Sequence, residues 1–216
     1  MPEDEPLIRW DWIDKHLGQF GDLTLEHLKL SLLPILFGLL VAVPLGVLCQ
    51  RWRWLYPPVL TVANILYAIP SLALFLFLLD YTGLTMWTVV IPLTLYTLSV
   101  LVPNVVDGLR QVPDHVRQAA IAMGYGPLRR LIAVELPIAV PVIMAGVRVA
   151  TVSNISLVSV GALIGIGGLG GLFKTGFDLQ FSTPVIAGVV LIIVLAVGFD
   201  LLLVLLQRLL TPWAVR

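Results

Sequence analysis

Residues 115–137 have the sequence HVRQAAIAMGYGPLRRLIAVELP, a basic and interrupted stretch in the middle of a very apolar chain. Gly124 is suited to the left-handed conformation that ends a helix, and Pro127 is suited to the first turn of the next helix. The pattern therefore predicts one helix over residues 116–123, a turn, and a second short helix over residues 128–135. Such a compact hairpin is a plausible docking element, because small side chains let another surface approach closely. The small residues are Ala119, Ala120 and Ala122.

The composition around this stretch predicts a membrane protein. Of the 216 residues, 59% are hydrophobic and 12% are charged, whereas soluble domains contain about 25% charged residues. Mean hydropathy is +1.00. Thirteen basic and thirteen acidic residues cancel, which argues against a nucleic-acid partner. The polar N-terminus lacks the features of a cleavable signal peptide.

Five apolar segments are long enough to span a bilayer, whose core of about 30 Å requires roughly 20 helical residues. Their approximate bounds are residues 30–48, 55–79, 81–106, 136–160 and 179–206. Several contain proline, which packed membrane helices tolerate. The predicted fold is thus an all-α, polytopic membrane helix bundle with five core helices. This bundle is expected to be embedded in the lipid bilayer.

Basic residues in the loops predict the orientation, because Lys and Arg gather on the cytoplasmic side. With the N-terminus outside, eight loop arginines are cytoplasmic and four basic residues are external. The cytoplasmic set is Arg51, Arg53, Arg110, Arg117, Arg129, Arg130, Arg208 and Arg216, and the external set is Arg9, Lys15, Lys29 and Lys174. This orientation places residues 115–137 and the C-terminus in the cytoplasm.

The chain divides by composition into three parts. Residues 1–22 form an acidic, partly amphipathic segment that we expect outside the cell. Residues 23–212 form the transmembrane domain, with a cytoplasmic loop at 110–137 to which the resemblance described below assigns coupling, and residues 213–216 form a cytoplasmic tail. Residues 10–29 are amphipathic, and Trp10 and Trp12 suit a membrane interface.

The spacing within residues 118–137 resembles the motif of binding-protein-dependent ABC importer permeases of the MetI-like superfamily. That motif is Glu-Ala-Ala, three residues, Gly, nine residues, then Ile-x-Leu-Pro. The chain has Gln in place of Glu and Val134 in place of Ile, with every spacing kept. The resemblance implies a coupling helix that enters a groove on an ATPase subunit. The residues assigned to coupling are Gln118, Ala119, Ala120, Gly124, Arg129, Leu136 and Pro137.

Further stretches resemble the osmoprotectant branch of these permeases. They are residues 43–47, 67–74 and 135–148 and the glycine-rich run 159–172, for which we predict a short, buried, re-entrant turn on the outer side. The resemblance covers about residues 25–212. It implies cargo such as glycine betaine, choline, carnitine or proline betaine. Ergothioneine, another trimethylated betaine, is an alternative cargo.

The resemblance also implies the partners and the energy source. They are an ABC ATPase, an extracytoplasmic substrate-binding protein and a second permease subunit, identical or different, in a bacterial or archaeal cytoplasmic membrane. The chain has no GxxxxGK[ST] motif, so ATP and Mg²⁺ are expected on the ATPase. We predict no catalytic, cofactor or metal site in this chain, and transport by ATP-driven alternating access.

Polar residues within the spans are candidates for the translocation path, where tyrosine faces attract quaternary ammonium groups. Serine and asparagine in spans also bridge helices, so either role is open. The principal candidates are Asn64, Tyr67, Ser71, Asn104, Ser153, Asn154 and Ser156; Tyr96, Ser99 and Ser159 are further ones. Arg148 and Asp200 are the deepest charges in the spans, and we predict that they form an ion pair because each would be costly alone.

Two other functions remain open at this point. An ion-coupled secondary carrier would transport without any ATPase. A membrane scaffold would show no substrate-stimulated ATP hydrolysis when it is purified with an ATPase.

Overall fold

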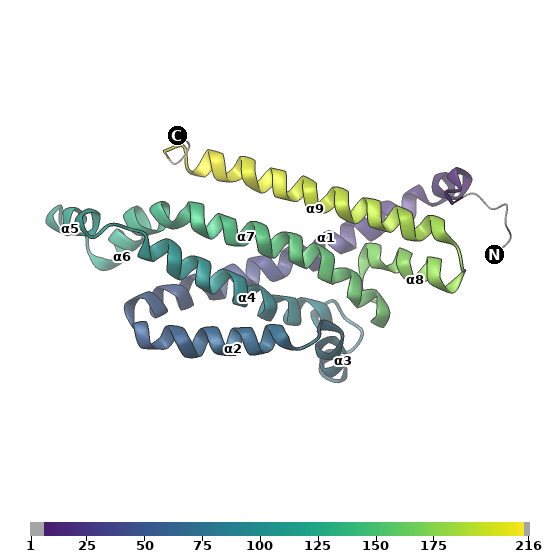
Figure 1. The fold of residues 1–216 in the computed structure, drawn as a ribbon, viewed down its shortest axis with the longest axis horizontal. Coiled ribbons are helices and arrows are strands. Elements are labelled where there is room, and N and C mark those ends of the chain that lie inside the picture. The colour runs from purple at the N-terminus through teal and green to yellow at the C-terminus, as the bar shows by residue number, and fades with distance from the viewer. Residues whose placement is uncertain (1–6, 214–216) are drawn as a thin grey trace. The chain divides into compact units, whose positions relative to one another are not determined.

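The computed structural model describes residues 7–213, and these residues are helical with no strand among them (Figure 1). The all-α class is therefore confirmed. Residues 1–6 of the predicted N-terminal segment and residues 214–216 of the predicted tail lie outside the described part. The helices are α1 (Trp10–Arg51), α2 (Tyr56–Ala68), α3 (Ser71–Thr82), α4 (Trp87–Arg110), α5 (Asp114–Ala122), α6 (Pro127–Arg130), α7 (Leu136–Val158), α8 (Gly171–Asp178) and α9 (Ser182–Leu210).

The chain forms two compact units, which are described separately. Unit 1 comprises Met1–Pro34, Ile69–Leu93 and Val152–Gly198, and unit 2 comprises Ile35–Ala68, Thr94–Thr151 and Phe199–Arg216. Helices α1, α4, α7 and α9 contribute residues to both units, whereas the α5–α6 hairpin belongs to unit 2.

Four continuous helical stretches are long and apolar enough to cross a membrane. They are Trp10–Arg51, Trp87–Arg110, Pro127–Ile164 and Ser182–Leu210. The bent pair Arg53–Ala68 and Ser71–Thr82 makes a fifth if it is counted as one span. The five predicted segments are thus mainly helical, although the third begins at Trp87 rather than at residue 81, and the chain is a multi-pass membrane protein.

The second predicted span is wrong as a continuous helix. The chain leaves the helical conformation after Ala68 and re-enters it at Ser71, with a bend of 92° between the two helices. Pro70 has no N–H and restricts the residue before it to extended conformations. Leu74 N–H donates to Pro70 O at 3.1 Å and begins α3. Packed membrane helices tolerate proline, but here proline divides the segment.

Two predicted boundaries are also wrong, because the helices are longer than expected. The amphipathic residues 10–29 are continuous with the first span in the 42-residue α1. The second hairpin helix is continuous with the fourth span, since a π-helical turn over Leu131–Glu135 joins α6 to α7. Pro137 lies just after this π-helical turn, inside the continuous stretch Pro127–Ile164, and does not separate the two helices.

Close contacts at glycine hold the helices of unit 2 together. A Cβ at Gly46 of α1 would collide with Val105 of α4, and a Cβ at Gly146 of α7 would lie 2.6 Å from Cγ of Asn104. Small residues at such crossings let membrane helices approach closely, and packing drives their association. Cys49 is buried in the same unit, with 1% of its surface exposed, as expected of packing filler.

The glycine-rich run is a tightly packed part of unit 1. It forms two 3₁₀ turns, Ser159–Ile164 and Gly168–Gly170, followed by α8, a short helix that the sequence analysis missed. A Cβ at Gly161 would collide with the carbonyl oxygen of Ile166. These contacts agree with the predicted buried turn.

His27 is a second buried feature of unit 1. Its side chain is fully buried, and its Nε2–H donates to the carbonyl oxygen of Ile155 at 2.8 Å. Gly168, at φ 49°, packs against the backbone of His27, where a Cβ would lie 2.7 Å from Cα. The glycine-rich turn therefore closes over the histidine of α1.

We expect Gly161→Ala to destabilise the protein, because the added methyl meets backbone that cannot move away cheaply. Overpacking of this kind costs about 1–3 kcal/mol. The thermal midpoint of the detergent-solubilised protein should fall. Gly171→Ala is the matched control, since a Cβ there meets nothing within 4 Å and the position is helical. Equal midpoints for the two variants would contradict the packing described here.

Candidate functional site

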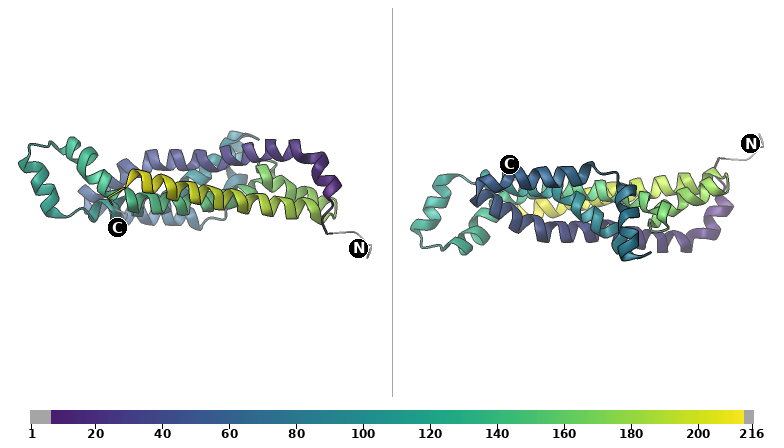
Figure 2. Two further views of the ribbon diagram at one scale, coloured as in Figure 1. Left: turned by 90° about the horizontal axis from the view of Figure 1, so that it is seen from above. Right: turned by 90° about the horizontal axis from the view of Figure 1, so that it is seen from below.

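The predicted docking hairpin is present and is built from a local turn. Gly124 has φ 81°, the left-handed conformation that the sequence predicted, and Pro127 is the first residue of α6. Tyr125 N–H donates to Ala120 O at 3.0 Å and closes the turn. We call Asp114–Arg130 the docking hairpin; it projects beyond the rest of unit 2 in both views of Figure 2.

The docking hairpin exposes both polar and apolar side chains. Gln118, Ala119, Gly124 and Arg129 are exposed, as a docking role requires. Ile121, Met123 and Leu128 are also exposed, by 55%, 68% and 69% of their surface. Exposed apolar residues gathered in this way indicate an interaction surface. The sequence analysis missed these three, although their position beside the small residues was a usable signal.

One residue of the predicted docking surface is placed differently. Ala120 is buried, with 1% of its surface exposed, so its methyl group is not available to a partner. Adjacent residues on a helix point about 100° apart, so Ala119 and Ala120 cannot face the same way. Leu136 and Pro137 are half-buried at the start of α7.

A charged cluster lies at the base of the docking hairpin. Arg130 Nε donates to Glu135 Oε1 at 2.7 Å, and Arg117 Nε lies 3.8 Å from Glu135 Oε2. The Glu135 side chain is only 5% exposed. We call Arg117, Arg130 and Glu135 the basal cluster. The sequence analysis assigned Glu135 no role, although an acid among apolar residues near three arginines was a usable signal.

In unit 2, Tyr67 is the path candidate placed best to meet a cation. Its ring meets the ring of Tyr96 edge-on, with centroids 5.5 Å apart and an interplanar angle of 74°. Tyr67 is 49% exposed, and the exposed Asn64 lies one turn earlier on α2. Asn104 instead donates from Nδ2 to Val100 O at 2.8 Å and fills the space beside Gly146, which fits a packing role.

The remaining principal candidates lie in unit 1, whereas the further candidate Ser99 lies in unit 2, where its hydroxyl donates to Tyr96 O at 2.8 Å. Asn154 is buried, Ser71 and Ser153 are half-buried, and Ser156 is exposed. The candidates are thus divided between the two units, with Asn64, Tyr67 and Asn104 in unit 2.

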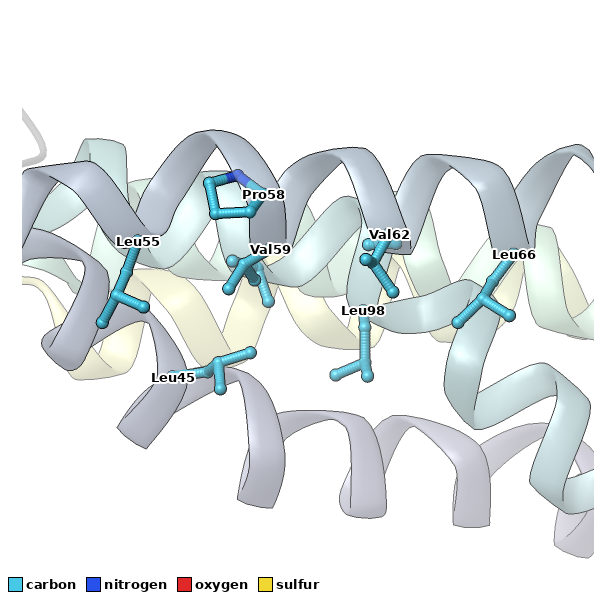
Figure 3. A pocket seen from close by; sticks show the side chains of 9 residues that line it. Leu45, Leu55, Pro58, Val59, Val62, Leu66 and Leu98 are labelled. Carbon is cyan, nitrogen blue, oxygen red and sulfur yellow. The ribbon is translucent and has the colours of Figure 1, made fainter.

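A pocket in unit 2 contains none of these candidates. It has a volume of about 340 Å³ and is lined only by apolar side chains from α1, η1 (Arg53–Leu55), α2 and α4 (Figure 3). Its lining residues are Leu45, Leu55, Pro58, Val59, Val62, Ala63, Leu66, Leu98 and Val102. Without a polar or aromatic group, it offers a quaternary amine no specific contact.

The structure brings Arg148 and Asp200 together. Arg148 Nε donates to Asp200 Oδ1 at 2.7 Å and its Nη2 donates to Oδ2 at 2.8 Å. The contact is a bidentate pair, the strongest geometry for these two groups. About one third of each side chain remains uncovered by this chain, 35% for Arg148 and 30% for Asp200.

Residues 28–212 match the family model of binding-protein-dependent transport system inner membrane components. The chain belongs to this family. The predicted permease and its MetI-like fold are thereby confirmed.

Curated relatives match this permease along nearly its whole length. It is 40% identical over 204 residues to the osmoprotectant import permease protein OsmW of Salmonella typhimurium, covering 92% of this chain and 95% of the relative. It is 34% identical over 205 residues to the choline transport system permease protein OpuBB of Bacillus subtilis, covering 91% and 94%.

Solved structures share the fold of this permease. An inward-facing MetNI methionine ABC transporter chain gives a TM-score of 0.77 at 22% identity, over 87% of this permease and 94% of that chain. An amino acid ABC transporter chain solved with histidines gives a TM-score of 0.72 at 17% identity, over 93% and 98%. At these identities the likeness concerns the fold.

We expect the Arg148–Asp200 pair to be energetically coupled in the permease. Arg148→Met and Asp200→Leu should each lower the thermal midpoint of the purified protein, because each leaves one charge unpaired in a spanning helix. The loss of unfolding free energy in the double variant should be smaller than the sum of the losses in the two single variants, by about 0.5–3 kcal/mol. Additive losses would contradict coupling. The exchange Arg148→Asp with Asp200→Arg is the control that keeps both charges.

Proposed function

We propose that this permease moves a quaternary-amine compatible solute, such as glycine betaine, choline, carnitine or proline betaine, into the cytoplasm by ATP-driven alternating access. The observation that carries the proposal is the match, over more than 90% of the chain, to permeases named for osmoprotectant and choline transport. Another betaine-like cargo such as ergothioneine would use the same machinery.

The chemistry of Tyr67 and Tyr96 supports a cationic cargo. A quaternary ammonium group has no N–H and cannot donate a hydrogen bond, so aromatic faces are suited to bind it, each contributing about 0.5–2 kcal/mol. Tyr67 is half-exposed and is held by Tyr96. Weak contacts of this size suit a path that must release its cargo. Tight recognition is left to the substrate-binding protein.

The exposed docking hairpin supports a mechanism in which a separate ATPase subunit hydrolyses ATP and the permease moves the cargo. Among residues 7–213 there is no group of three or more His, Cys, Asp or Glu that could hold a metal ion. In the proposed complex, ATP and Mg²⁺ are bound by the ATPase, the permease is not catalytic, and the hairpin conveys the energy of hydrolysis.

Two permease subunits, identical or different, would pair to form the path, and the substrate-binding protein would deliver cargo to the outer face. The proposed orientation has the N-terminus outside and the docking hairpin and C-terminus in the cytoplasm. The distribution of basic loop residues favours it.

Reconstitution tests this function directly. Vesicles that hold the permease with its ATPase, supplied with the binding protein and ATP, should accumulate labelled glycine betaine or choline. Vesicles without the ATPase should accumulate neither, even under an ion gradient. Gradient-driven uptake without the ATPase would indicate a secondary carrier instead. Uptake of ergothioneine alone would revise the cargo, and ATP hydrolysis insensitive to every solute would favour a scaffold.

Gly124→Val should impair coupling, because a β-branched residue is strained at φ 81°. A non-glycine residue in this conformation costs about 1–2 kcal/mol, which corresponds to a fall in uptake of roughly five- to thirtyfold. No atom lies within 4 Å of the added Cβ, so the effect is on the backbone. Gly124→Asn, which tolerates this conformation, and Gly126→Ala are the controls. Normal uptake by Gly124→Val would contradict the coupling role.

A further inference from the structure

The basal cluster differs from the other ion pairs of the described residues in having a buried acid that is shared by two arginines. Asp107–Arg110 and Lys174–Asp178 each join one turn of a single helix, and their side chains are 39–55% exposed. Pairs of that kind contribute little. Glu135, by contrast, is 5% exposed and contacts two arginines from two different helices. Its charge is therefore compensated mainly by the protein.

Arg117 extends the cluster to the end of α4. Its Nη2 donates to the carbonyl oxygen of Leu109 at 2.6 Å, and its Nη1 donates to Asp114 Oδ1 at 3.2 Å. Leu109 lies in the last turn of α4, where carbonyl oxygens lack helical partners and favour a cation. One arginine of α5 thus bridges the end of α4 and the acid that precedes α7.

The π-helical turn is what allows the second contact. Arg130 and Glu135 are five residues apart, and on a regular α-helix the neighbours on one face are three or four apart. In the turn Leu131–Glu135 the bonds run from residue i to i+5, as Leu136 N–H to Leu131 O shows, so residues five apart come together. The ion pair and the π turn therefore depend on one another.

We propose that Glu135 is the positioning residue that fixes the docking hairpin to α4 and α7, so that a displacement of the hairpin is passed to the spanning helices. The proposal rests on the coupling role proposed above. A single carboxylate, on the residue that directly precedes α7, connects α5 through Arg117 and α6 through Arg130. Without the charge of Glu135, the guanidinium groups of Arg117 and Arg130 have no acid between them. The π turn then loses the contact between residues 130 and 135.

Glu135→Gln keeps the length of the side chain and removes its charge. In vesicles containing the complete transporter, we expect ATP hydrolysis to continue while solute accumulated per ATP hydrolysed falls by roughly two- to thirtyfold. Glu135→Asp, which keeps the negative charge toward both arginines, should retain much more of the ratio than Glu135→Gln. Asp107→Asn is the matched control, because it removes an exposed carboxylate near the same end of α4, and its ratio should stay at the wild-type value.

An unchanged ratio in Glu135→Gln would overturn the proposal. If that variant does not assemble with the ATPase, Arg130→Gln is measured in its place. The solute accumulated per ATP hydrolysed should then fall by the same factor. If neither assembles, the cluster serves stability alone and the proposal is overturned.

Amide hydrogen exchange provides a readout that does not require the cargo. In the wild-type complex, amides of residues 131–136 should be protected, and in Glu135→Gln they should exchange faster, while those of α5 remain unchanged. If the wild type accumulates no tested solute, the proposed cargo fails, but the exchange comparison still decides the role of Glu135. Equal exchange in both proteins would count against it.

Discussion

Lipid offers no hydrogen bonds to the backbone, so each N–H and C=O within the hydrocarbon core needs a partner inside the protein. A chain with mean hydropathy of +1.00 can meet that demand by folding as helix, and its described residues do so. The same demand explains where the helices depart from regularity. The break at Pro70 and the 3₁₀ turns around Gly161 occur where proline or glycine alters the backbone, and at Gly161 packed neighbours cover the chain.

In the docking hairpin, the residues available to a partner differ from the residues that join the hairpin to the rest of unit 2. Its exposed surface presents Ile121, Met123 and Leu128, which suit an apolar groove, whereas Arg117 and Arg130 lie at the base around Glu135. Gln118, at the position where the family motif has an acid, is exposed and neutral. The buried acid of this region is Glu135, seventeen positions later in the chain, and it faces inward rather than toward a partner.

Features that depend on neighbouring residues in the sequence could be predicted, whereas features that depend on tertiary contacts could not. Gly124 and Pro127 act within a single turn, so the hairpin could be recognised, and the cost of lone charges in lipid was enough to pair Arg148 with Asp200. The inward orientation of Ala120, the closure of Gly168 over His27 and the π turn before Leu136 depend on contacts between distant parts of the chain or on hydrogen bonds of unusual register. Pro70 was visible in the sequence, but whether a proline bends or divides a helix depends on its neighbours.

The burial of Cys49 has a practical consequence for spectroscopy. It is the only cysteine of the chain, and its thiol is covered by unit 2, so maleimide or nitroxide reagents will react with it slowly. A cysteine placed on the exposed face of the docking hairpin can therefore be labelled selectively in the otherwise natural sequence. Distances from such a label would report the movement of the hairpin during the ATP cycle without first replacing a packed core residue.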